Sequence, residues 1–563
     1  MTDLIERARK WIETDPDPGT RRELAAVIDS GDLDDLESRM ETALTFGTAG
    51  IRGEVGAGPG RMNRAVVIRT TFGLADYLAG ATRPVVVGFD ARPTSRSFAE
   101  DTAGVLAAAG IPVLYFPKVT PTPLVAFAAK HLGAIAAVVV TASHNPPADN
   151  GYKVYGEKAS QIVSPVDLEI QAGIDDSPGA ADVPRIEGVF DGTSEFVRPV
   201  PEDILDCYWE EVSDARVRTK GSDLDIVYTP IHGVGGDVLL ELMRRAGHNS
   251  VTEVPEQAEP DGSFPTVSFP NPEEPGALDL ARDLAEESDA DLIIANDPDA
   301  DRLAAVVPHA GKWRNLTGNE IGVLLGDYVL SADPDPGRAI VVSSIVSSPM
   351  LSRIAAHYGA RHESTLTGFK WIVKAGLTLE EETDARFVFG YEEALGFTVG
   401  STVRDKDGMS AGVIFTDLVA DLKDHGKVVT DRLHELWRAH GLWVSSQVSI
   451  VREGVEGSRQ LQEAVARLAD NPPDRVGGRE VVAVTDYRTG GEFRPLWLGA
   501  QDLVELDLGE AGRMLVRPSG TEPKLKVYVD LCGVVTGDPD ADQLALADDA
   551  AKLGEALSGS LGV

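Results

Sequence analysis

The chain has 563 residues, several times the usual domain size, which predicts three or four domains. Hydrophobic residues make up 43% and charged residues 25% of the sequence, a balance typical of soluble globular proteins and not of disordered or fibrous ones. The 90 acidic residues outnumber 52 basic ones, and the net charge of -38 disfavours nucleic acid and anionic lipid as partners.

The cysteine content and the apolar runs indicate in which cellular compartment the protein is expected. Cys207 and Cys532 are the only cysteines, so the sequence contains no disulfide framework, CxxC motif or cysteine zinc site. The first residues carry charges where a secretory signal needs an apolar core. The longest apolar run, at 134–142, is too short to span a bilayer. We therefore expect a cytoplasmic protein without membrane partners.

The elements of the first half predict a helical leader followed by an α/β domain. Residues 1–45 mix polar and apolar positions at helical spacing. Short apolar runs then alternate with helical stretches, a pattern typical of buried strands between helices. The predicted strands are 83–92, 111–116 and 134–142, and the predicted helices are 97–109 and 124–131.

The alternation of short apolar strands with helical stretches occurs twice more before the pattern changes. A second α/β unit has strands at 223–230 and 290–297, and a third has strands at 338–348 and 385–397. From about residue 443, longer alternating strands and two helices predict an α+β domain. The fold class is therefore α/β, with three similar domains of mixed sheets and a terminal α+β domain around a central cleft. The expected domains are 1–210, 211–325, 326–445 and 446–563.

A polar loop at 143–154 follows the apolar strand at 134–142, at the edge where ligands bind in open α/β sheets. It begins with Ser143, which we expect to be exposed and held by stiff neighbours, as a covalent phosphoryl carrier requires. His144 and Lys153 are the local candidates for moving protons. On its own, the string Ser-His-Asn-Pro is equally typical of a simple turn.

Three aspartates at alternate positions, Asp297, Asp299 and Asp301, follow the strand at 290–297. Their oxygens would suit a hard cation such as Mg²⁺. An EF-hand is excluded, because its sixth position would be Arg302 instead of Gly and its twelfth Pro308 instead of Glu. A solvated acidic turn is the alternative in so acidic a chain.

Four further strings are weak signals when taken alone. TGFK (367–370) and GYEEALG (390–396) are typical of a chain reaching solvent, and GTAGIRG (47–53) is typical of a turn. RPSGTEPKLK (517–526) combines a guanidinium, hydroxyls, backbone amides and ammonium groups that could all donate to one phosphate. A basic surface hairpin is the alternative for this last string.

Taken together, the strings resemble the motifs of the α-phosphohexomutases, the family that includes phosphoglucomutase and phosphomannomutase. TASHNPPADNGYKVY (141–155) resembles the family's phosphoserine loop, and NDPDADR (296–302) its magnesium loop. GTAGIRG, GYEEALG and RPSGTEPKLKVY resemble its first motif, its sugar loop and its phosphate loop. The resemblance spans about residues 45 to 530. DARPTSRSF (90–98) and FPNPE (269–273) also resemble family strings and are interpreted as scaffold.

The resemblance implies roles for individual side chains. The residues implied in catalysis are Ser143 as phosphoryl carrier, Lys153 as general acid or base, Arg52, and the neighbouring His144. The implied metal ligands are Ser143, Asp297, Asp299 and Asp301. The residues implied in substrate binding are Arg302, Thr367, Gly368, Lys370 and Glu392. The residues implied in phosphate binding are Arg517, Ser519, Gly520, Thr521 and Lys526. Ala394 stands where serine is common, so one sugar contact should be missing.

The function implied is that of a Mg²⁺-dependent isomerase that transfers a phosphoryl group within a phosphosugar. We expect a sugar 1-phosphate and its 6-phosphate to interconvert through phosphoserine and a sugar 1,6-bisphosphate, with glucose favoured. The form GYEEALG is similar to a subgroup of bacterial α-phosphoglucomutases and phosphopentomutase-type enzymes, so mannose and pentose phosphates are alternatives. A sugar phosphatase is a further alternative. A non-catalytic binding protein is disfavoured, because Ser143, Lys153 and the three aspartates are intact. The oligomeric state stays open.

Overall fold

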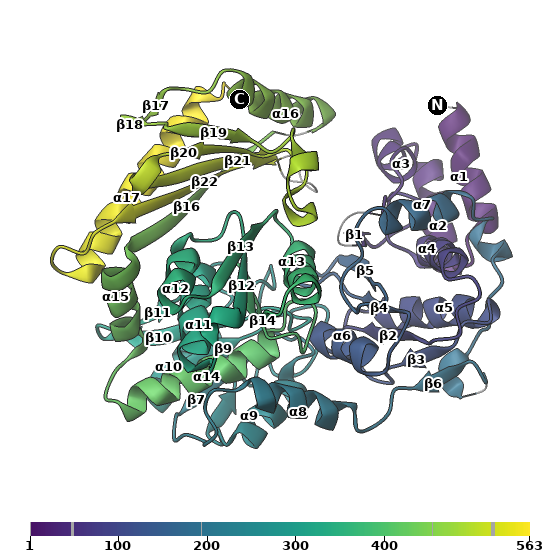
Figure 1. Ribbon diagram of the computed structural model, residues 1–563. Coiled ribbons are helices and arrows are strands. Elements are labelled where there is room, and N and C mark those ends of the chain that lie inside the picture. Colours follow the sequence, from purple (N-terminus) through teal and green to yellow (C-terminus); the bar gives the residue numbers. More distant parts are fainter. Residues whose placement is uncertain (1, 47–49, 193, 453, 519–523, 563) are drawn as a thin grey trace. The chain divides into compact units, whose positions relative to one another are not determined.

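The computed structural model describes residues 2–46, 50–192, 194–452, 454–518 and 524–562. The chain forms two compact units. The first consists of Met1–Asn315 and Phe397–Asp417, and the second of Leu316–Gly396 and Leu418–Val563. Figure 1 labels the helices and strands of both units.

The predicted helical leader is confirmed as three helices. These are α1 (Thr2–Thr14), α2 (Pro18–Ser30) and α3 (Leu33–Met40). Asp17 and Asp32 cap the amino ends of α2 and α3 with side-chain acceptors, which satisfies otherwise unpaired backbone N–H groups. Ala8, Leu24 and Leu36, one from each helix, are buried in a small shared core.

The first α/β domain is built on a mixed six-stranded sheet. In sheet order its strands are β1 (Ile51–Glu54), β5 (Asp149–Tyr155), β4 (Ala136–Val140), β2 (Val85–Phe89), β3 (Val113–Tyr115) and β6 (Val197–Pro199). β5 runs antiparallel to β1 and β4, and the others are parallel. Every residue of β2 and β4 is buried, as their apolar runs predict. The predicted loop after Ser143 is partly wrong, because its second half pairs as β5.

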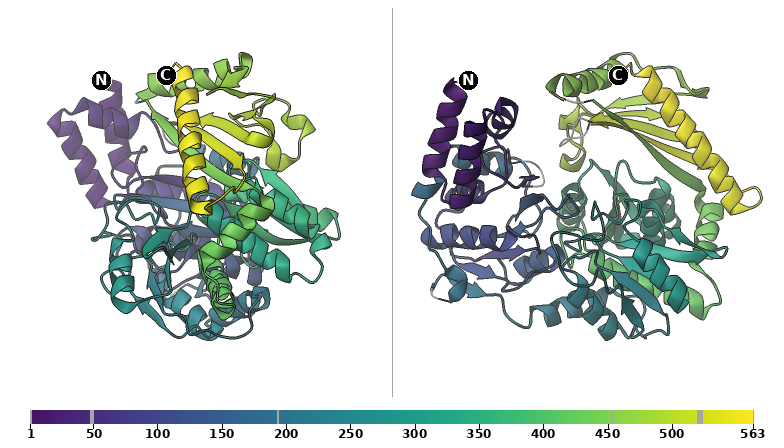
Figure 2. Two further views of the ribbon diagram at one scale, coloured as in Figure 1. Left: turned by 90° about the vertical axis from the view of Figure 1, so that its left-hand side faces the viewer. Right: turned by 180° about the vertical axis from the view of Figure 1, so that it is seen from behind.

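Helices cover this sheet, and α5 and α6 contact β2 and β4 directly. The helices are α4 (Arg64–Tyr77), α5 (Ser95–Ala108), α6 (Thr122–His131) and α7 (Val166–Asp175), with the short 3₁₀ helices η1 (Ala180–Asp182) and η2 (Val189–Asp191). α4 packs against α5 and α7. Figure 2 shows the leader helices beside this domain.

The second α/β domain completes the first unit. Its five-stranded sheet has the order β11 (Lys312–Asn315), β10 (Ala304–His309), β9 (Leu292–Ala295), β7 (Ile226–Thr229) and β8 (Val251–Glu253). Its helices are α8 (Ile204–Ala215), α9 (Gly236–Ala246) and α10 (Asp279–Ser288). β7 is parallel to β8 and β9, while β10 is antiparallel to both of its neighbours.

The segment Phe397–Asp417 returns to this unit and is held by buried charges. Arg216 donates two hydrogen bonds of 2.8 Å to Asp417, and His248 Nε2 lies 2.9 Å from the same carboxylate. A Cβ at Gly408 would come within 2.0 Å of the carbonyl oxygen of Arg302, so only glycine fits there. The segment therefore lies directly against the loop that follows β9.

The second unit contains the third α/β domain. β12 (Ala339–Ser344) lies between β13 (Arg361–Thr365) and β14 (Arg386–Glu392) and is parallel to both. The helices are α11 (Gly318–Ala332), α12 (Met350–Tyr358), α13 (Phe369–Glu382) and α15 (Val429–His440), with η3 (Pro336–Arg338). β15 (Gly396–Val399) and α14 (Gly408–Asp424) carry the chain from this unit to the first and back.

The terminal α+β domain belongs to the second unit as well. Its antiparallel sheet has the order β16 (Leu442–Val451), β22 (Lys524–Gly533), β21 (Gly512–Pro518), β20 (Val504–Asp507) and β19 (Ala483–Asp486). α16 (Gly454–Asp470) and α17 (Pro539–Ser560) lie against this sheet (Figure 2), and their apolar side chains join its hydrophobic core. The remaining short elements are β17 (Arg475–Val476), β18 (Arg479–Glu480), η4 (Gly491–Phe493), η5 (Leu496–Leu498) and η6 (Gly509–Ala511).

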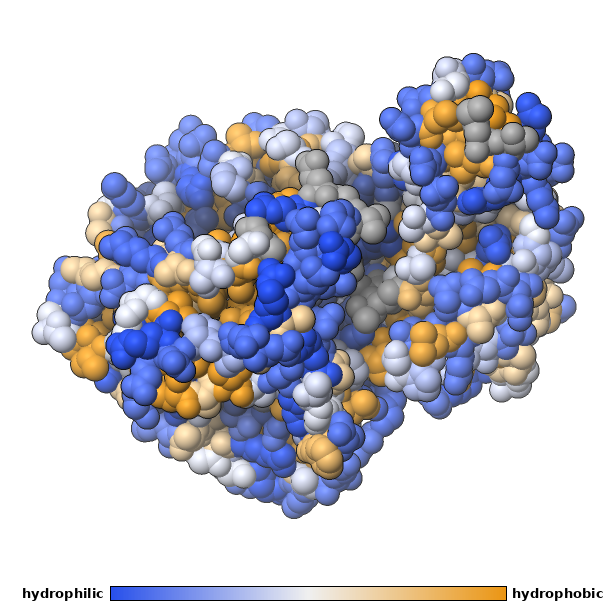
Figure 3. All heavy atoms as spheres, turned by 90° about the horizontal axis from the view of Figure 1, so that it is seen from above, coloured by the Kyte–Doolittle hydropathy of each residue, from blue (hydrophilic) through white to orange (hydrophobic). Residues whose placement is uncertain are grey.

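The face of the molecule in Figure 3 is largely hydrophilic. Hydrophilic side chains spread widely over the face in Figure 3, with smaller apolar areas between them. Within the described ranges, every helix is too short or too polar to cross a membrane.

Candidate active site

Ser143 lies in a tight turn just after β4. Its φ of 52° is in the left-handed region, which a residue with a side chain rarely adopts. Its N–H donates to Thr141 Oγ1 at 2.8 Å, which holds the turn. Its Oγ donates to Asp297 Oδ2 at 2.8 Å and lies 3.1 Å from His144 Nδ1. The expectation of an exposed serine is wrong: Ser143 is 2% exposed, because these side chains cover it.

Arg92 holds the backbone of the serine loop. Its guanidinium donates to four backbone carbonyls, those of Ser143 (2.9 Å), Asn145 (2.6 Å), Pro146 (2.6 Å) and Asp149 (2.8 Å). Its Nε lies 3.3 Å from Asp90 Oδ2, and the side chain is buried. Burial lowers the pKa of Arg92 and nearby carboxylates oppose this shift. The string 90–98 is therefore scaffold, as predicted, and it determines the position of the serine.

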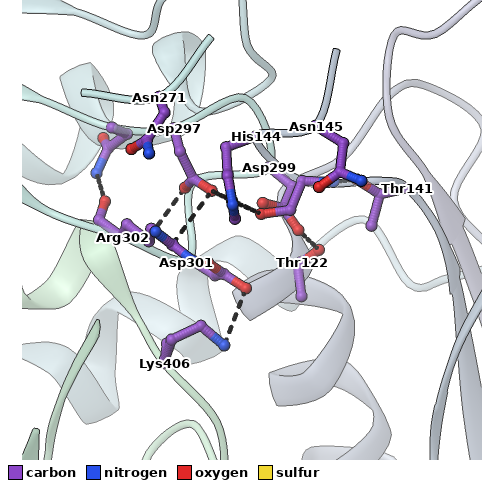
Figure 4. A network of polar contacts seen from close by, with 12 residues as sticks. Thr122, Thr141, His144, Asn145, Asn271, Asp297, Asp299, Asp301, Arg302 and Lys406 are labelled. Carbon is purple, nitrogen blue, oxygen red and sulfur yellow. Dashed lines mark hydrogen bonds and ion pairs between the residues drawn. The ribbon is translucent and has the colours of Figure 1, made fainter. Parts of the chain in front are cut away.

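The loop after β9 carries Asp297, Asp299 and Asp301, whose carboxylates lie close together (Figure 4). One carboxylate oxygen from each lies within 4.8 Å of the other two, and all three residues are buried. Ala300 between them adopts a φ of 58°, which turns the loop tightly. Among the described residues, Asp299 Oδ1 and Asp301 Oδ1 have no hydrogen-bond partner. Buried anionic oxygens need a compensating cation, so the cluster fits a hard divalent metal ion.

The ammonium groups of two lysines form ion pairs with this cluster. Lys153 Nζ lies 2.7 Å from Asp299 Oδ2 and 3.0 Å from Asp301 Oδ2. Lys406 Nζ lies 3.2 Å from Asp301 Oδ2 (Figure 4). Burial alone would lower the pKa of Lys153, but the two carboxylates raise it above its ordinary value. Lys153 is therefore an ammonium in the folded chain.

The three carboxylates differ in their protonation. Burial and repulsion from its two neighbours raise the pKa of Asp297 well above the ordinary value. Burial would also raise the pKa of Asp299, but Lys153 and the hydroxyl of Thr122, 2.7 Å away, lower it overall. A divalent cation at the free oxygens would favour the ionised form of all three, because it would offset their mutual repulsion.

His144 is a neutral imidazole beside the serine. Burial lowers its pKa well below the ordinary value, and the positive charges of Arg302 and Arg52 add to this shift. Arg302 donates its backbone N–H to Asp297 Oδ1 at 3.0 Å. Arg52 lies on β1, opposite Gly151 of β5, while residues 47–49 of the same motif lie outside the described residues. The first unit thus brings together every residue expected in catalysis and metal binding, and Arg302.

The residues expected to bind sugar lie in the second unit. Thr367 and Gly368 immediately precede α13, and Gly368 has a φ of 110°, which favours glycine. Lys370 is buried with its Nζ 5.2 Å from the ring centre of Trp371. Glu392 is the last residue of β14.

The residues expected to bind phosphate also lie in the second unit. Arg517 of β21 and Lys526 of β22 are direct cross-strand partners, so two cations stand side by side. Ser519, Gly520 and Thr521, which join these strands, lie outside the described residues.

Sequence reasoning missed Lys406, which lies more than 100 residues beyond Asp301. Its Nζ is 3.3 Å from Asp405 Oδ1, and Asp405 accepts a hydrogen bond of 2.7 Å from Tyr155. The available signal was the charged string RDKDG (404–408) between two apolar segments. Charged residues at that position are usually solvated, so the string alone did not indicate a buried ammonium.

Comparison with family models gives four consecutive matches along the chain. They are described as phosphoglucomutase/phosphomannomutase α/β/α domain I (residues 43–178), domain II (206–311), domain III (317–440) and the C-terminal domain (459–533).

Curated relatives match over most of their length. A Haemophilus influenzae protein described as a probable phosphomannomutase is 41% identical, over 85% of this chain and 95% of its own. The Saccharomyces cerevisiae phosphoribomutase is 35% identical, over 94% and 93% of the two chains. A Staphylococcus aureus phosphoglucomutase is 33% identical, over 91% and 93%.

A solved structure shares the fold. The crystal structure of a phosphoglucomutase/phosphomannomutase family protein from Burkholderia thailandensis superposes with a TM-score of 0.64 at 22% identity. It covers 90% of this chain and 96% of its own.

Proposed function

Because the chain belongs to the phosphoglucomutase/phosphomannomutase family and is an intramolecular phosphotransferase, that is an isomerase, we propose that it interconverts glucose 1-phosphate and glucose 6-phosphate, with Ser143 as phosphoryl carrier. The observation that carries the proposal is the buried contact of 2.8 Å between Ser143 Oγ and Asp297 Oδ2. This contact supports the proposal, because the serine oxygen, held in a turn with a positive φ, lies beside a cluster whose oxygens fit a divalent cation.

The proposed reaction has two half-reactions. Phosphorylated Ser143 first transfers its phosphoryl group to the free hydroxyl of a sugar monophosphate, so one P–O bond breaks at Oγ and another forms at the sugar oxygen. The sugar hydroxyl loses a proton and Oγ gains one. The resulting sugar 1,6-bisphosphate turns over in the site and returns its other phosphoryl group to Ser143, with the proton movements reversed. The same bisphosphate, supplied externally, would load Ser143 for the first turnover.

Proton transfer is assigned to two neighbours of Ser143. Lys153 is an ammonium, since Asp299 and Asp301 raise its pKa, and it donates to Oγ as the phosphoryl group leaves. His144 is a neutral imidazole 3.1 Å from Oγ, and it accepts the proton that the sugar hydroxyl loses. When Ser143 attacks the bisphosphate, Lys153 takes the proton back from Oγ and His144 returns its proton to the sugar oxygen, so both groups are restored.

The metal would be Mg²⁺, held by Asp297, Asp299, Asp301 and an oxygen on Ser143. The hard carboxylate oxygens and the two unpartnered ones among them support this ligand set. When bound, Mg²⁺ withdraws negative charge from the group in transfer. The solved structure of the Aspergillus fumigatus N-acetylphosphoglucosamine mutase is described as a complex with GlcNAc-6P and magnesium, at 16% identity and a TM-score of 0.50.

The remaining residues are assigned to binding. Arg52 and Arg302 offset charge on the transferring phosphoryl group, because both lie close enough to His144 to lower its pKa. In the second unit, Thr367, Gly368, Lys370 and Glu392 are assigned to the sugar. Arg517, Ser519, Gly520, Thr521 and Lys526 are assigned to the phosphate that does not react.

A pentose phosphate is the second candidate substrate. The yeast relative named phosphoribomutase is slightly more similar to this chain than the staphylococcal phosphoglucomutase. By the family resemblance, Ala394 also stands where serine is common, so one hydroxyl contact to the sugar is missing. Mannose phosphates share the mechanism, and the relative that is 41% identical is described with that sugar.

The test is a coupled assay with Mg²⁺ and catalytic glucose 1,6-bisphosphate, in which the 1-phosphates of glucose, mannose and ribose are offered in parallel. We expect isomerisation without release of free phosphate, and we expect Ser143→Ala to abolish it. The ratio of kcat/KM values ranks the sugars. Sustained phosphate release without isomerisation would identify a sugar phosphatase and refute the proposal.

A further inference from the structure

A cavity of about 410 Å³ lies where the leader helix α1 packs beside α4 and the end of α7. Arg7, Lys10 and Trp11 of α1 line one side. Arg69 of α4 and residues 177–180 line the other. All of these residues belong to the first unit, and no residue assigned above to catalysis, metal, sugar or phosphate lines the cavity.

The cavity is basic in a protein of net charge -38. In the part of the chain that the structure describes, no carboxylate oxygen lies within 4.0 Å of the side-chain nitrogens of Arg7, Lys10 or Arg69. Both arginines donate only to neutral oxygens: Arg7 to the carbonyl of Met40, and Arg69 Nε to Ser177 Oγ at 2.7 Å. Three cations without acidic partners on one cavity form a local attraction for anions.

The cavity also has an apolar wall, formed by side chains that include Met40, Pro59 and Ala65. Beside it, the indole Nε1 of Trp11 is buried and has no hydrogen-bond partner among the described residues. A buried donor without a partner is costly, and an acceptor on a bound molecule would satisfy it. Burial lowers the pKa of Arg69 and Asp175 partly opposes this shift, so Arg69 would also gain from a close anion.

We propose that this cavity is a second ligand site, which binds a small organic phosphate monoester. Arg7, Lys10 and Arg69 hold the phosphate, as guanidinium and ammonium groups do in other phosphate sites. The organic body of the ligand lies against Trp11 and the apolar wall. The volume falls within the range of small-molecule pockets, about 300–1,000 Å³, and is far larger than inorganic phosphate needs.

The site depends on the docking of α1. The first family match begins at residue 43, so the leader that supplies two of the three cations lies outside all four family models. α1 is seated closely: a Cβ at Gly179 would come within 2.7 Å of Thr14 Cβ. A ligand that bridges α1 and α4 stabilises this docking, since it binds only the assembled cavity.

The test is isothermal titration of the full-length protein with adenosine 5′-monophosphate, a phosphate monoester with a planar body. Glycerol 3-phosphate and inorganic phosphate are titrated as further arms. Lys10→Gln and Arg69→Gln should each weaken binding of the nucleotide about tenfold or more, because each removes a charged donor. Arg9→Gln, on the exposed part of the same helix and outside the cavity, should change the affinity less than about twofold.

Three outcomes overturn the proposal. They are an unchanged nucleotide affinity in Lys10→Gln, an absence of saturable binding of either ester at millimolar concentration, and an inorganic phosphate affinity equal to that of the esters. Lys10 is exposed and its ammonium forms no hydrogen bond among the described residues, so Lys10→Gln folds even if Arg69→Gln does not. A rise in melting temperature on addition of the nucleotide, lost in Lys10→Gln, is the expected second readout.

Discussion

Arg92→Lys tests whether the geometry of the serine loop sets the rate. The guanidinium of Arg92 reaches four carbonyls of the loop, those of Ser143, Asn145, Pro146 and Asp149, at 2.6 to 2.9 Å. A lysine ammonium carries its three N–H groups on a single atom and cannot span them. At least two of the four hydrogen bonds should be lost, and the positive charge is kept.

The magnitude follows from the lost bonds. A hydrogen bond from a charged donor contributes about 1.5–3 kcal/mol, so two bonds contribute about 3–6 kcal/mol to holding the loop. Ser143 sits at an unfavourable φ, so a released loop moves its Oγ away from the aspartates. If the transition state loses the smaller amount of stabilisation, about 3 kcal/mol, kcat falls about 100-fold. KM should change less than about threefold, because Arg92 is buried and contacts loop backbone.

The assay measures kcat and KM separately and also the fraction of chains phosphorylated on serine. Arg96→Lys, an exposed position in the same string, is the matched control and should behave as wild type. If Arg92→Lys keeps kcat within about twofold of wild type while the protein stays folded, the loop geometry does not depend on Arg92 and the reasoning is refuted.

Three further predictions concern the metal, the phosphate site and pH. Asp299→Asn should raise the Mg²⁺ concentration for half-maximal activity about tenfold or more, because one buried anionic ligand becomes neutral. The exposed control Asp289→Asn should leave this concentration unchanged. An unchanged Mg²⁺ titration in Asp299→Asn contradicts the ligand set. Arg517→Ala should raise KM about tenfold and lower kcat in steady-state assays, since it removes a charged donor; unchanged kinetics exclude a phosphate-binding role. Burial and Arg513 lower the pKa of His362 to about 4, so below pH 6.5 the unfolded chain binds a proton that the folded chain does not. The free energy of unfolding should therefore fall by up to about 3 kcal/mol between pH 6.5 and 4. Denaturant titrations of His362→Gln should show a smaller loss over the same pH range. Equal losses in the variant and the wild type refute His362 as the cause.

The family, the α/β fold class and the mutase class were predictable from the sequence and are confirmed. The reason is that the chemistry lies on short strings after buried apolar strands. Ser143 follows β4 and Asp297 follows β9, so pattern and motif indicated the same loops. The domain boundaries near 210, 325 and 445 stay predictions.

What the sequence did not reveal depends on contacts between distant segments. The burial of Ser143 results from Asp297, which lies 154 residues further along the chain. Lys406 joins the acidic cluster because Gly408 allows its segment to approach the carbonyl of Arg302. Neither contact has a local pattern, since the spacing within a string carries no information about which strings meet.

The most direct test of the central claim is to identify the residue that carries the phosphoryl group. The protein is incubated with Mg²⁺ and glucose 1,6-bisphosphate, and its phosphorylation is mapped by mass spectrometry of peptides. We predict one phosphoryl group per chain, on Ser143, that disappears when excess sugar monophosphate is added and that never forms in Ser143→Ala. A phosphoryl group on another residue, or mutase activity that survives in Ser143→Ala, would contradict the account.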